Sequence, residues 1–259
     1  MDYLIRLVKA IVPERYHTTL VEIYRICRLF LYIGNRYICP CCGWRFRVFL
    51  PFGVKPRPSA QCPRCGSLER HRLLWLYLKN RTNLFSDNLK VLHFAPEYIF
   101  QKTFRFMPNL DYISADLDSP LAMVKVDITN ILYDDNSFDV ILCSHVLEHV
   151  IDDREAMKEL FRVLKPGGWA ILQAPIPAEH DKTFEDSDIV LPEDRERIFG
   201  QKDHVRIYGR DYKDRLEKAG FTVKLDGYVK ELESDRIRKY GLIVDENIYF
   251  CTKPRLKKD

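Results

Sequence analysis

The sequence lacks a long hydrophobic run. Its 259 residues contain no apolar stretch close to the roughly 18 residues that a membrane-spanning helix needs. The first residues, MDYLIRLVKAIVPERY, also lack the apolar core and the small-residue cleavage site of a secretory signal. A net charge of only +4 gives no whole-chain reason to expect nucleic-acid binding. We therefore expect a soluble, cytoplasmic protein, in which paired cysteines indicate a metal site before a disulfide.

The chain is rich in apolar residues, at 46% hydrophobic and 12% aromatic, which is enough for a packed core. Its composition divides it into three segments: residues 1–36 with two N-terminal helices, residues 37–80 with a cysteine-rich module and a connecting helix, and residues 86–259 with an α/β domain. The N-terminal helices have an apolar face beside arginines. We expect this face to dock onto the rest of the protein. The alternative is peripheral membrane contact through residues 1–34, close to a lipid-linked acceptor.

Two copies of the pattern Cys-Pro-x-Cys-Gly lie in the second segment, CPCCG at 39–43 and CPRCG at 62–66. Two Cys-x-x-Cys pairs at this separation predict a structural zinc site of the ribbon type. In each copy the chain turns tightly and a glycine relieves the turn, so that two sulfurs reach one ion. Because Cys41 does not reproduce the spacing of the second pair, we expect these four ligands: Cys39, Cys42, Cys62 and Cys65.

The surroundings of the cysteines are basic, with Glu69 as the single carboxylate between residues 36 and 72. Basic zinc ribbons can bind nucleic-acid phosphates, which makes RNA an alternative partner. Arginines also solvate small domains without any partner. The pattern therefore indicates a metal more clearly than it indicates a function.

From residue 90 onward, apolar strand-like segments alternate with helical patterns. The helical patterns are clearest at 153–165, followed by Pro-Gly-Gly as a stop signal, and at 209–220. This alternation predicts a Rossmann-like α/β fold, a mainly parallel sheet with helices on both faces. The seven expected strands are 90–94, 112–116, 123–127, 138–144, 169–175, 221–225 and 247–253.

The junction KVLHFAPEYIF at 90–100 reads as a first strand, a turn and a helix start, yet it contains no glycine. Asp116 follows Pro96 by 20 positions, at the end of the second expected strand. A dinucleotide-type fold places its ribose-binding carboxylate at about this distance. Asp116 is therefore a candidate ligand of a ribose.

Two longer stretches resemble one enzyme family. DITNILYDDNSFDVILCSHVLEHV at 127–150 and ELFRVLKPGGWAILQAP at 159–175 are similar to class I S-adenosylmethionine-dependent methyltransferases, in particular the small-molecule-type subgroup. The resemblance covers residues 90–253. It implies S-adenosylmethionine as the cofactor and methyl transfer as the activity.

The resemblance also implies roles for single residues. Asp116 is expected at the ribose with Leu117 beside the adenine. Asp127 is expected to accept the adenine amino group, and the backbone N–H of Ile128 to face the ring. Ser144 and His145 end the fourth strand, where the family exposes its active centre to the sulfonium.

The chain departs from the family in its first turn, where an acidic residue and glycines are usual. Here the chain has His93, Ala95 and Pro96, which we expect at the methionine end of the cofactor. Ala95 keeps the turn small, and Pro96 fits at a helix start because its missing N–H is not needed there. The cofactor carries no phosphate, so it does not require a glycine-rich phosphate cradle.

Methyl transfer is an in-line displacement, so the enzyme mainly aligns the acceptor and excludes water. A hydroxyl or protonated amine acceptor also benefits from a general base, for which His145 is the first candidate. Residues 176–210 are charged, follow the fifth strand and are expected to form a lid. We expect His149 to anchor the next helix. Candidate acceptor contacts in the lid are His180 and His204, which are also candidate catalytic residues, with Asp181, Glu185, Arg206 and Tyr208.

Three functions fit the sequence. The first is methyl transfer to a small-molecule or glycan-like acceptor, at oxygen or nitrogen. The second is RNA methylation, with the zinc ribbon holding the substrate. The third is a catalytically inactive, zinc-stabilised binding protein.

Overall fold

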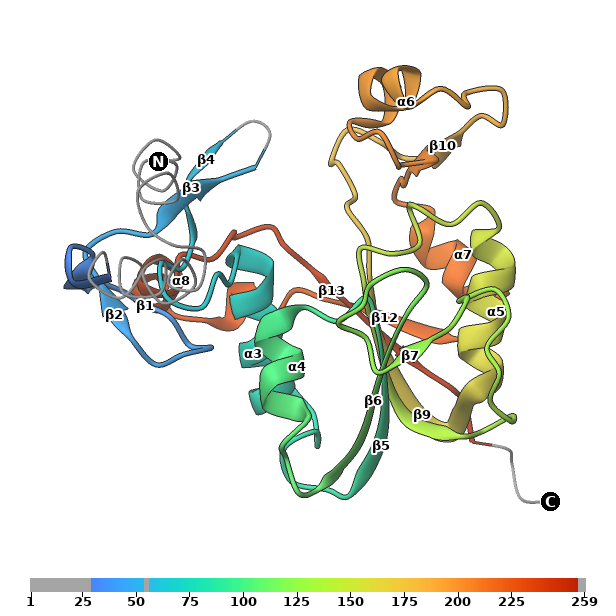
Figure 1. The fold of residues 1–259 in the computed structure, drawn as a ribbon, viewed down its shortest axis with the longest axis horizontal. Helices are drawn as coiled ribbons and strands as arrows, with labels where there is room; N and C mark the ends of the chain where they lie inside the picture. The colour runs from blue at the N-terminus through green and yellow to red at the C-terminus, as the bar shows by residue number, and fades with distance from the viewer. Residues whose placement is uncertain (1–28, 54–55, 256–259) are drawn as a thin grey trace, which may run out of the picture. The chain divides into compact units, whose positions relative to one another are not determined.

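The computed structural model describes residues 29–53 and 56–255 and divides them into two compact units (Figure 1). The first unit contains the described residues up to Leu76 together with Val229–Val244. The second contains Tyr77–Tyr228 and the chain from Asp245 onward. Most of the expected N-terminal helices, and with them the proposed membrane contact, lie outside the described residues. No helix in the described part of the chain has the length and apolar character to cross a membrane.

The first unit consists of two small hairpins and a helix. Strand β1 (Ile33–Ile38) pairs antiparallel with β2 (Arg45–Phe46), and β3 (Leu50–Phe52) pairs antiparallel with β4 (Arg57–Gln61). Residues 33–36, expected at the end of a helix, are therefore in a strand. Helix α8 (Ser234–Tyr240) completes this unit, and helix α3 (Glu69–Arg81) begins in it.

The predicted division left residues 229–244 within the α/β domain, whereas the structure places them with the cysteine-rich unit. Arg72 gives the physical reason. Its side chain is fully buried and donates to the carbonyl oxygens of Tyr240, at 2.6 Å, and Gly241, at 2.7 Å. The same guanidinium donates to the carbonyls of Ala60 and Ser67, so one arginine joins segments far apart in the sequence.

The second unit is built on a seven-stranded sheet in the order β12-β13-β9-β8-β5-β6-β7. All seven expected strands are present, and β13 is antiparallel to both of its neighbours while the other pairs are parallel. The strands are β5 (Leu89–Phe94), β6 (Leu110–Asp116), β7 (Val124–Lys125), β8 (Phe138–Ser144), β9 (Leu164–Gln173), β12 (Thr222–Asp226) and β13 (Ile248–Thr252). Strand β9 begins earlier than expected, because Leu164 already pairs with Phe138 ahead of the Pro-Gly-Gly turn.

Helices cover both faces of this sheet, as the alternating pattern predicted (Figure 1). On one face, α5 (Asp153–Val163) and α7 (Tyr212–Lys218) bury Met157, Leu160 and Leu216 in the main hydrophobic core. On the other face, α4 (Tyr98–Phe104) packs its phenylalanine rings near His93 and Tyr112. A short 3-10 helix, η2 (Tyr228–Glu231), follows β12.

The expected lid forms a small structure of its own, seen with α6 and β10 at the top of Figure 1. Strands β10 (Phe184–Glu185) and β11 (Arg206–Ile207) pair antiparallel, and α6 (Pro192–Phe199) lies between them in sequence. The buried guanidinium of Arg206 donates to the carbonyls of Leu147, at 2.7 Å, and Ile151, at 2.8 Å, and also to that of Val150. Arg206 therefore fixes the insertion to the loop that follows β8.

Candidate functional site

A cavity of about 860 Å³ lies at the carboxyl ends of the parallel strands. Strand β5 is flanked by β6 on one side and β8 on the other, so the strand order reverses here. Open α/β sheets bind their ligands at such a switch point. The wall includes Ala95 after β5, Asp116 at the end of β6 and His145 after β8. The volume lies in the range typical of cofactor sites.

Asp116 closes the turn after β6 and keeps part of its carboxylate available. Its Oδ1 accepts the backbone N–H groups of Asp118 and Ser119, both at 2.8 Å. In the described part of the chain, Oδ2 has no hydrogen-bond partner. Leu117 also lines the cavity and is half exposed. The turn thus holds the carboxylate rigid while one oxygen can accept a hydroxyl.

Asp127 and Ile128 form another part of the wall. The Oδ1 atom of Asp127 accepts the backbone N–H of Thr129 at 2.8 Å and its hydroxyl at 2.7 Å. Within the described residues its other carboxylate oxygen has no partner. The two aspartates are therefore presented in the same way, each with one oxygen fixed by its own turn.

The glycine-free turn after β5 brings one of its three predicted residues to the cavity. Ala95 lines it, with a left-handed backbone at φ 45° and its N–H donating to the carbonyl of Ala115 at 2.9 Å. His93 is buried beneath the turn, where its ring nitrogens lie 2.9 Å from the Tyr112 hydroxyl and 3.0 Å from a carboxylate oxygen of Glu97. Pro96 is outside the lining as well.

His145 lines the cavity directly after β8 and also has a left-handed backbone, at φ 57°. Its N–H donates to the carbonyl of Gln173 at 2.8 Å, which fixes this unusual conformation. Its Nδ1 lies 3.2 Å from Oε1 of the buried Glu148. Ser144, by contrast, is buried outside the lining, and its hydroxyl has no partner among the described residues.

The insertion contributes Asp203 to the cavity wall. The residues of the insertion that were candidate acceptor contacts are not in that wall. His180 is outside the lining. His204 is buried, with its ring perpendicular to that of His149 at 4.7 Å. Arg206 and Tyr208 were expected to contact the acceptor, but both are buried and bonded internally; the Tyr208 hydroxyl lies 2.6 Å from Oδ2 of Asp153.

Several wall residues were not among the predicted site residues. His149 was expected only to anchor a helix, yet it lines the cavity and its Nδ1 lies 3.1 Å from a carboxylate oxygen of Asp203. Its position in the sequence, four residues after His145, was the one feature that could have indicated a place in the site. Others found in the structure are Asp152, Glu155, Val146, Val150 and Ile151.

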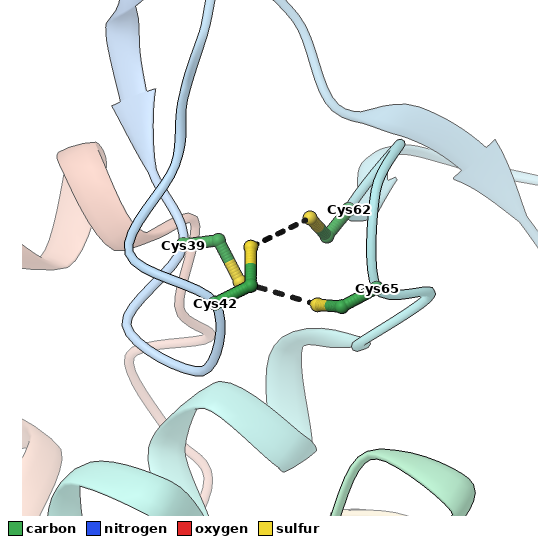
Figure 2. A group of neighbouring side chains, drawn as sticks. All are labelled: Cys39, Cys42, Cys62 and Cys65. Atoms are coloured by element: carbon green, nitrogen blue, oxygen red, sulfur yellow. Dashed lines mark hydrogen bonds between the residues drawn. The ribbon is translucent and has the colours of Figure 1, made fainter. Parts of the chain in front are cut away.

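The four predicted cysteine ligands converge in the first unit (Figure 2). The sulfurs of Cys39 and Cys65 are 3.6 Å apart and those of Cys42 and Cys62 are 3.8 Å apart. A tetrahedral zinc with Zn–S bonds of about 2.3 Å requires sulfurs about 3.8 Å apart. The donor set and its spacing therefore fit a zinc ion.

The two cysteine turns have the same backbone geometry. Gly43 and Gly66 both have φ of 72° and donate to the carbonyls of the first cysteine of each pair, at 2.8 and 3.0 Å. A positive φ at these positions is the reason for glycine. Cys41 is not one of the four converging cysteines, although it packs beside them, and its sulfur lies 3.7 Å from the carbonyl oxygen of His71.

The part of the chain that matches a known family model includes residues of the cavity wall. Residues 107–172 match the family model described as a methyltransferase domain. The match spans β6, β7, β8 and α5, and it contains Asp116, Asp127 and His145.

Curated relatives match part of the chain. A ubiquinone/menaquinone biosynthesis C-methyltransferase of Vibrio campbellii is 28% identical over 46% of this chain and 46% of its own length. A demethylmenaquinone methyltransferase of Clavibacter sepedonicus is 40% identical over 21% of this chain and 22% of its own. The chain spans less than half the length of these relatives. An S-adenosylmethionine-dependent methyltransferase structure from Mesorhizobium loti has a TM-score of 0.48 and 14% identity, covering 68% of this chain and 96% of that one.

Proposed function

We propose that this protein transfers a methyl group from S-adenosylmethionine to a small-molecule acceptor. The observation that carries the proposal is the pair of aspartates in the cavity, Asp116 and Asp127, each with one carboxylate oxygen that has no hydrogen-bond partner among the described residues. The free oxygen of Asp116 would accept the ribose hydroxyls, and that of Asp127 the adenine amino group. Ala95, at the end of β5, would lie near the methionine part. The match of residues 107–172 to a methyltransferase domain supports this assignment.

The acceptor we favour carries an apolar ring of the quinone type. The support comes from the names of the relatives and from the wall of the cavity, where Val146, Val150 and Ile151 offer apolar surface beside His145. A glycan-like acceptor, methylation at oxygen or nitrogen and an RNA substrate stay predictions from sequence, because no contact in the described residues supports them.

S-adenosylmethionine, when bound, would supply the methyl group: its sulfur–methyl bond would break as the acceptor atom bonds to the methyl carbon, and the acceptor would lose a proton. We assign that proton to His145. With its Nδ1–H donating to Glu148, the ring presents Nε2 as a base. The left-handed backbone aims the ring from the strand end. The cavity wall would align the two reactants.

We also propose that Cys39, Cys42, Cys62 and Cys65 bind a structural Zn²⁺ ion. Their sulfur spacing and the paired glycine turns support this. The first unit has few buried side chains around the cysteines, among them Phe46 and Phe49. A metal would supply folding free energy that so small a core cannot.

The activity is tested by incubating the protein with S-adenosylmethionine carrying a labelled methyl group and a panel of hydroquinones, phenols, amines, sugars and RNA. We expect label in a ring-type acceptor with the parent protein and with Asp111→Ala, a control on the exposed side of β6. Asp116→Ala should lose at least tenfold in kcat/KM, and His145→Ala should lower kcat while cofactor binding persists. Cofactor binding without transfer to any acceptor would contradict the proposal and favour a binding protein.

A further inference from the structure

A second cluster of metal-ligating side chains lies beside the cavity, in the second unit. Glu148, His149 and His204 each bring one ligand atom to within 4.8 Å of the other two. Glu148 and His149 belong to the loop after β8, and His204 directly precedes Val205 and β11 in the insertion. Two segments more than 50 residues apart thus converge on one point.

The environment of the Glu148 carboxylate is the main evidence for a ligand at this cluster. Its side chain is 1% exposed, and Oε1 is 3.2 Å from Nδ1 of His145. Its other oxygen, Oε2, is buried with no hydrogen-bond partner in the described part of the chain. A buried carboxylate oxygen without a partner is destabilising, because its lost hydration is not replaced. A cation beside Oε2 would remove this cost.

The two histidines have the arrangement of metal ligands. Nδ1 of His149 lies 3.1 Å from a carboxylate oxygen of Asp203, and Nδ1 of His204 lies 3.3 Å from the carbonyl oxygen of Phe199. A ligating histidine typically donates its other ring N–H to a carboxylate or a backbone carbonyl, which fixes the ring and its tautomer. Here Nδ1 of each ring has such a partner, so each Nε2 is the nitrogen left to bind a metal.

The backbone around the cluster is fixed. The N–H of Val205 donates to the carbonyl of Glu148 at 2.9 Å, next to the contacts of Arg206 with the same loop. The local charge also favours a cation, since Asp152, Glu155 and Asp203 line the adjoining cavity. The site is therefore both pre-organised and acidic.

We propose that Glu148, His149 and His204 bind a divalent transition-metal ion. Two imidazoles and one carboxylate suit zinc, iron or related ions better than magnesium or calcium, which prefer all-oxygen sites. Three protein ligands leave coordination positions open, as in metal sites that bind water or a substrate. His149 lines the cavity, so those positions adjoin the space assigned to the acceptor. Metal binding here does not depend on the proposed methyl transfer.

The test is titration of the metal-free protein with Co²⁺, whose absorption distinguishes thiolate from imidazole and carboxylate ligands. We expect two equivalents to bind. One gives intense thiolate charge-transfer bands from the cysteines, and the other gives only weak d–d bands. Glu148→Gln and His204→Gln should each lose the second equivalent and keep the thiolate bands. His180→Ala, which alters a histidine of the same insertion outside the cluster, should keep both.

A separate variant covers the case in which a buried substitution prevents folding. His149 is about a third exposed, and His149→Gln should fold while weakening the second equivalent at least tenfold. The proposal is overturned if the parent protein binds no Co²⁺ beyond the thiolate site, or if Glu148→Gln, His204→Gln and His149→Gln bind the second equivalent as tightly as the parent. The cluster would then be a hydrogen-bonded group without metal.

Discussion

Ala95 takes the left-handed backbone conformation that a glycine would normally adopt in the turn after β5. Its φ of 45° lies in the left-handed region, where an L-residue is disfavoured by roughly 1–2 kcal/mol. The chain accepts this because the N–H of Ala95 is held by the carbonyl of Ala115. A methyl group is also the smallest side chain that can stand at the cavity wall.

We expect Ala95→Gly to fold with a stability within about 1 kcal/mol of the parent, because relief of the backbone offsets the greater freedom of glycine in the unfolded chain. Ala95→Val should destabilise the fold by ~1–2 kcal/mol or more, since a branched side chain tolerates positive φ poorly, and should also weaken S-adenosylhomocysteine binding. Urea unfolding and calorimetry measure the two effects. Equal behaviour of the two variants would contradict this account of the turn.

At the scale of single residues, the position of a residue relative to the end of a strand was a better guide to the cavity wall than the chemical type of its side chain. Asp116 was predicted from its place at the end of a strand, 20 residues after Pro96, and the role of Asp127 from the family resemblance; both line the cavity. His93 was placed at the cofactor because it stands where the family usually has an acidic residue. Its burial depends on Tyr112 of the neighbouring strand and on Glu97 after the turn, contacts that spacing alone does not reveal.

At the scale of elements, a partly exposed ion network links strand β10 of the insertion to helix α7. Glu185 of β10 accepts from Arg206 at 2.9 Å and from Arg215 of α7 at 2.8 Å. Burial raises the pKa of Glu185, but the hydrogen bonds from Arg215 and Arg206 outweigh it and lower the pKa to about 2. The paired form is thus the charged one.

A folded-state pKa below the unfolded value of about 4.3 means that Glu185 stabilises the fold above about pH 5. This contribution is lost as the pH falls from 5 to 2. We expect Glu185→Gln to lower the thermal midpoint at pH 7 and to match the parent near pH 2. Glu217→Gln, which removes a surface pair with Lys213, serves as a control with little effect. A difference that grows at low pH would contradict the assignment.

In the first unit, Arg72 holds separate segments of the chain together. Its guanidinium donates to four backbone carbonyls and stacks on Phe49 at 4.4 Å. We expect Arg72→Met to destabilise this unit by ~3 kcal/mol or more, because the buried carbonyls lose their donor. Arg45→Met, at an exposed position of the same unit, should have little effect. Hydrogen exchange of residues 29–76 measures the loss, and unchanged protection in Arg72→Met would disprove the role.

The elements that could be predicted well from the sequence are those with an apolar pattern within their own residues. Strand β8 was predicted to the residue, as a run of apolar side chains buried on both faces. The internal structure of the insertion was not predicted. Its strands β10 and β11 are two residues each, and they are positioned by Arg206 rather than by apolar periodicity.

At the scale of the whole molecule, the two units have different sources of stability. The second has an extended apolar core across its sheet, whereas the first combines a few aromatic rings with four converging thiols. We expect a chelator to raise hydrogen exchange in residues 29–76 and 229–244 while β5, β8 and β9 stay protected. Cys65→Ser should show the same pattern without chelator. Uniform loss of protection across both units would contradict separate stabilisation.

Three segments of different composition could be distinguished along the sequence, but not their full extent. From residue 90 onward the sequence pattern changes, and the alternating strands and helices there predicted the sheet. Residues 229–244 carry no cysteine, so nothing in their composition links them to the cysteine-rich unit. That link lies in the backbone carbonyls of Tyr240 and Gly241, which every residue possesses.

The central claim is that the cavity binds the cofactor through Asp116. Calorimetric titration with S-adenosylhomocysteine tests it most directly, on the parent, Asp116→Ala and Asp111→Ala. Loss of a charge-assisted hydrogen bond to the ribose should weaken binding by ~1.5–3 kcal/mol, which is at least tenfold. Binding should be unchanged in Asp111→Ala. No binding by the parent, or equal binding by the parent and Asp116→Ala, would contradict the account.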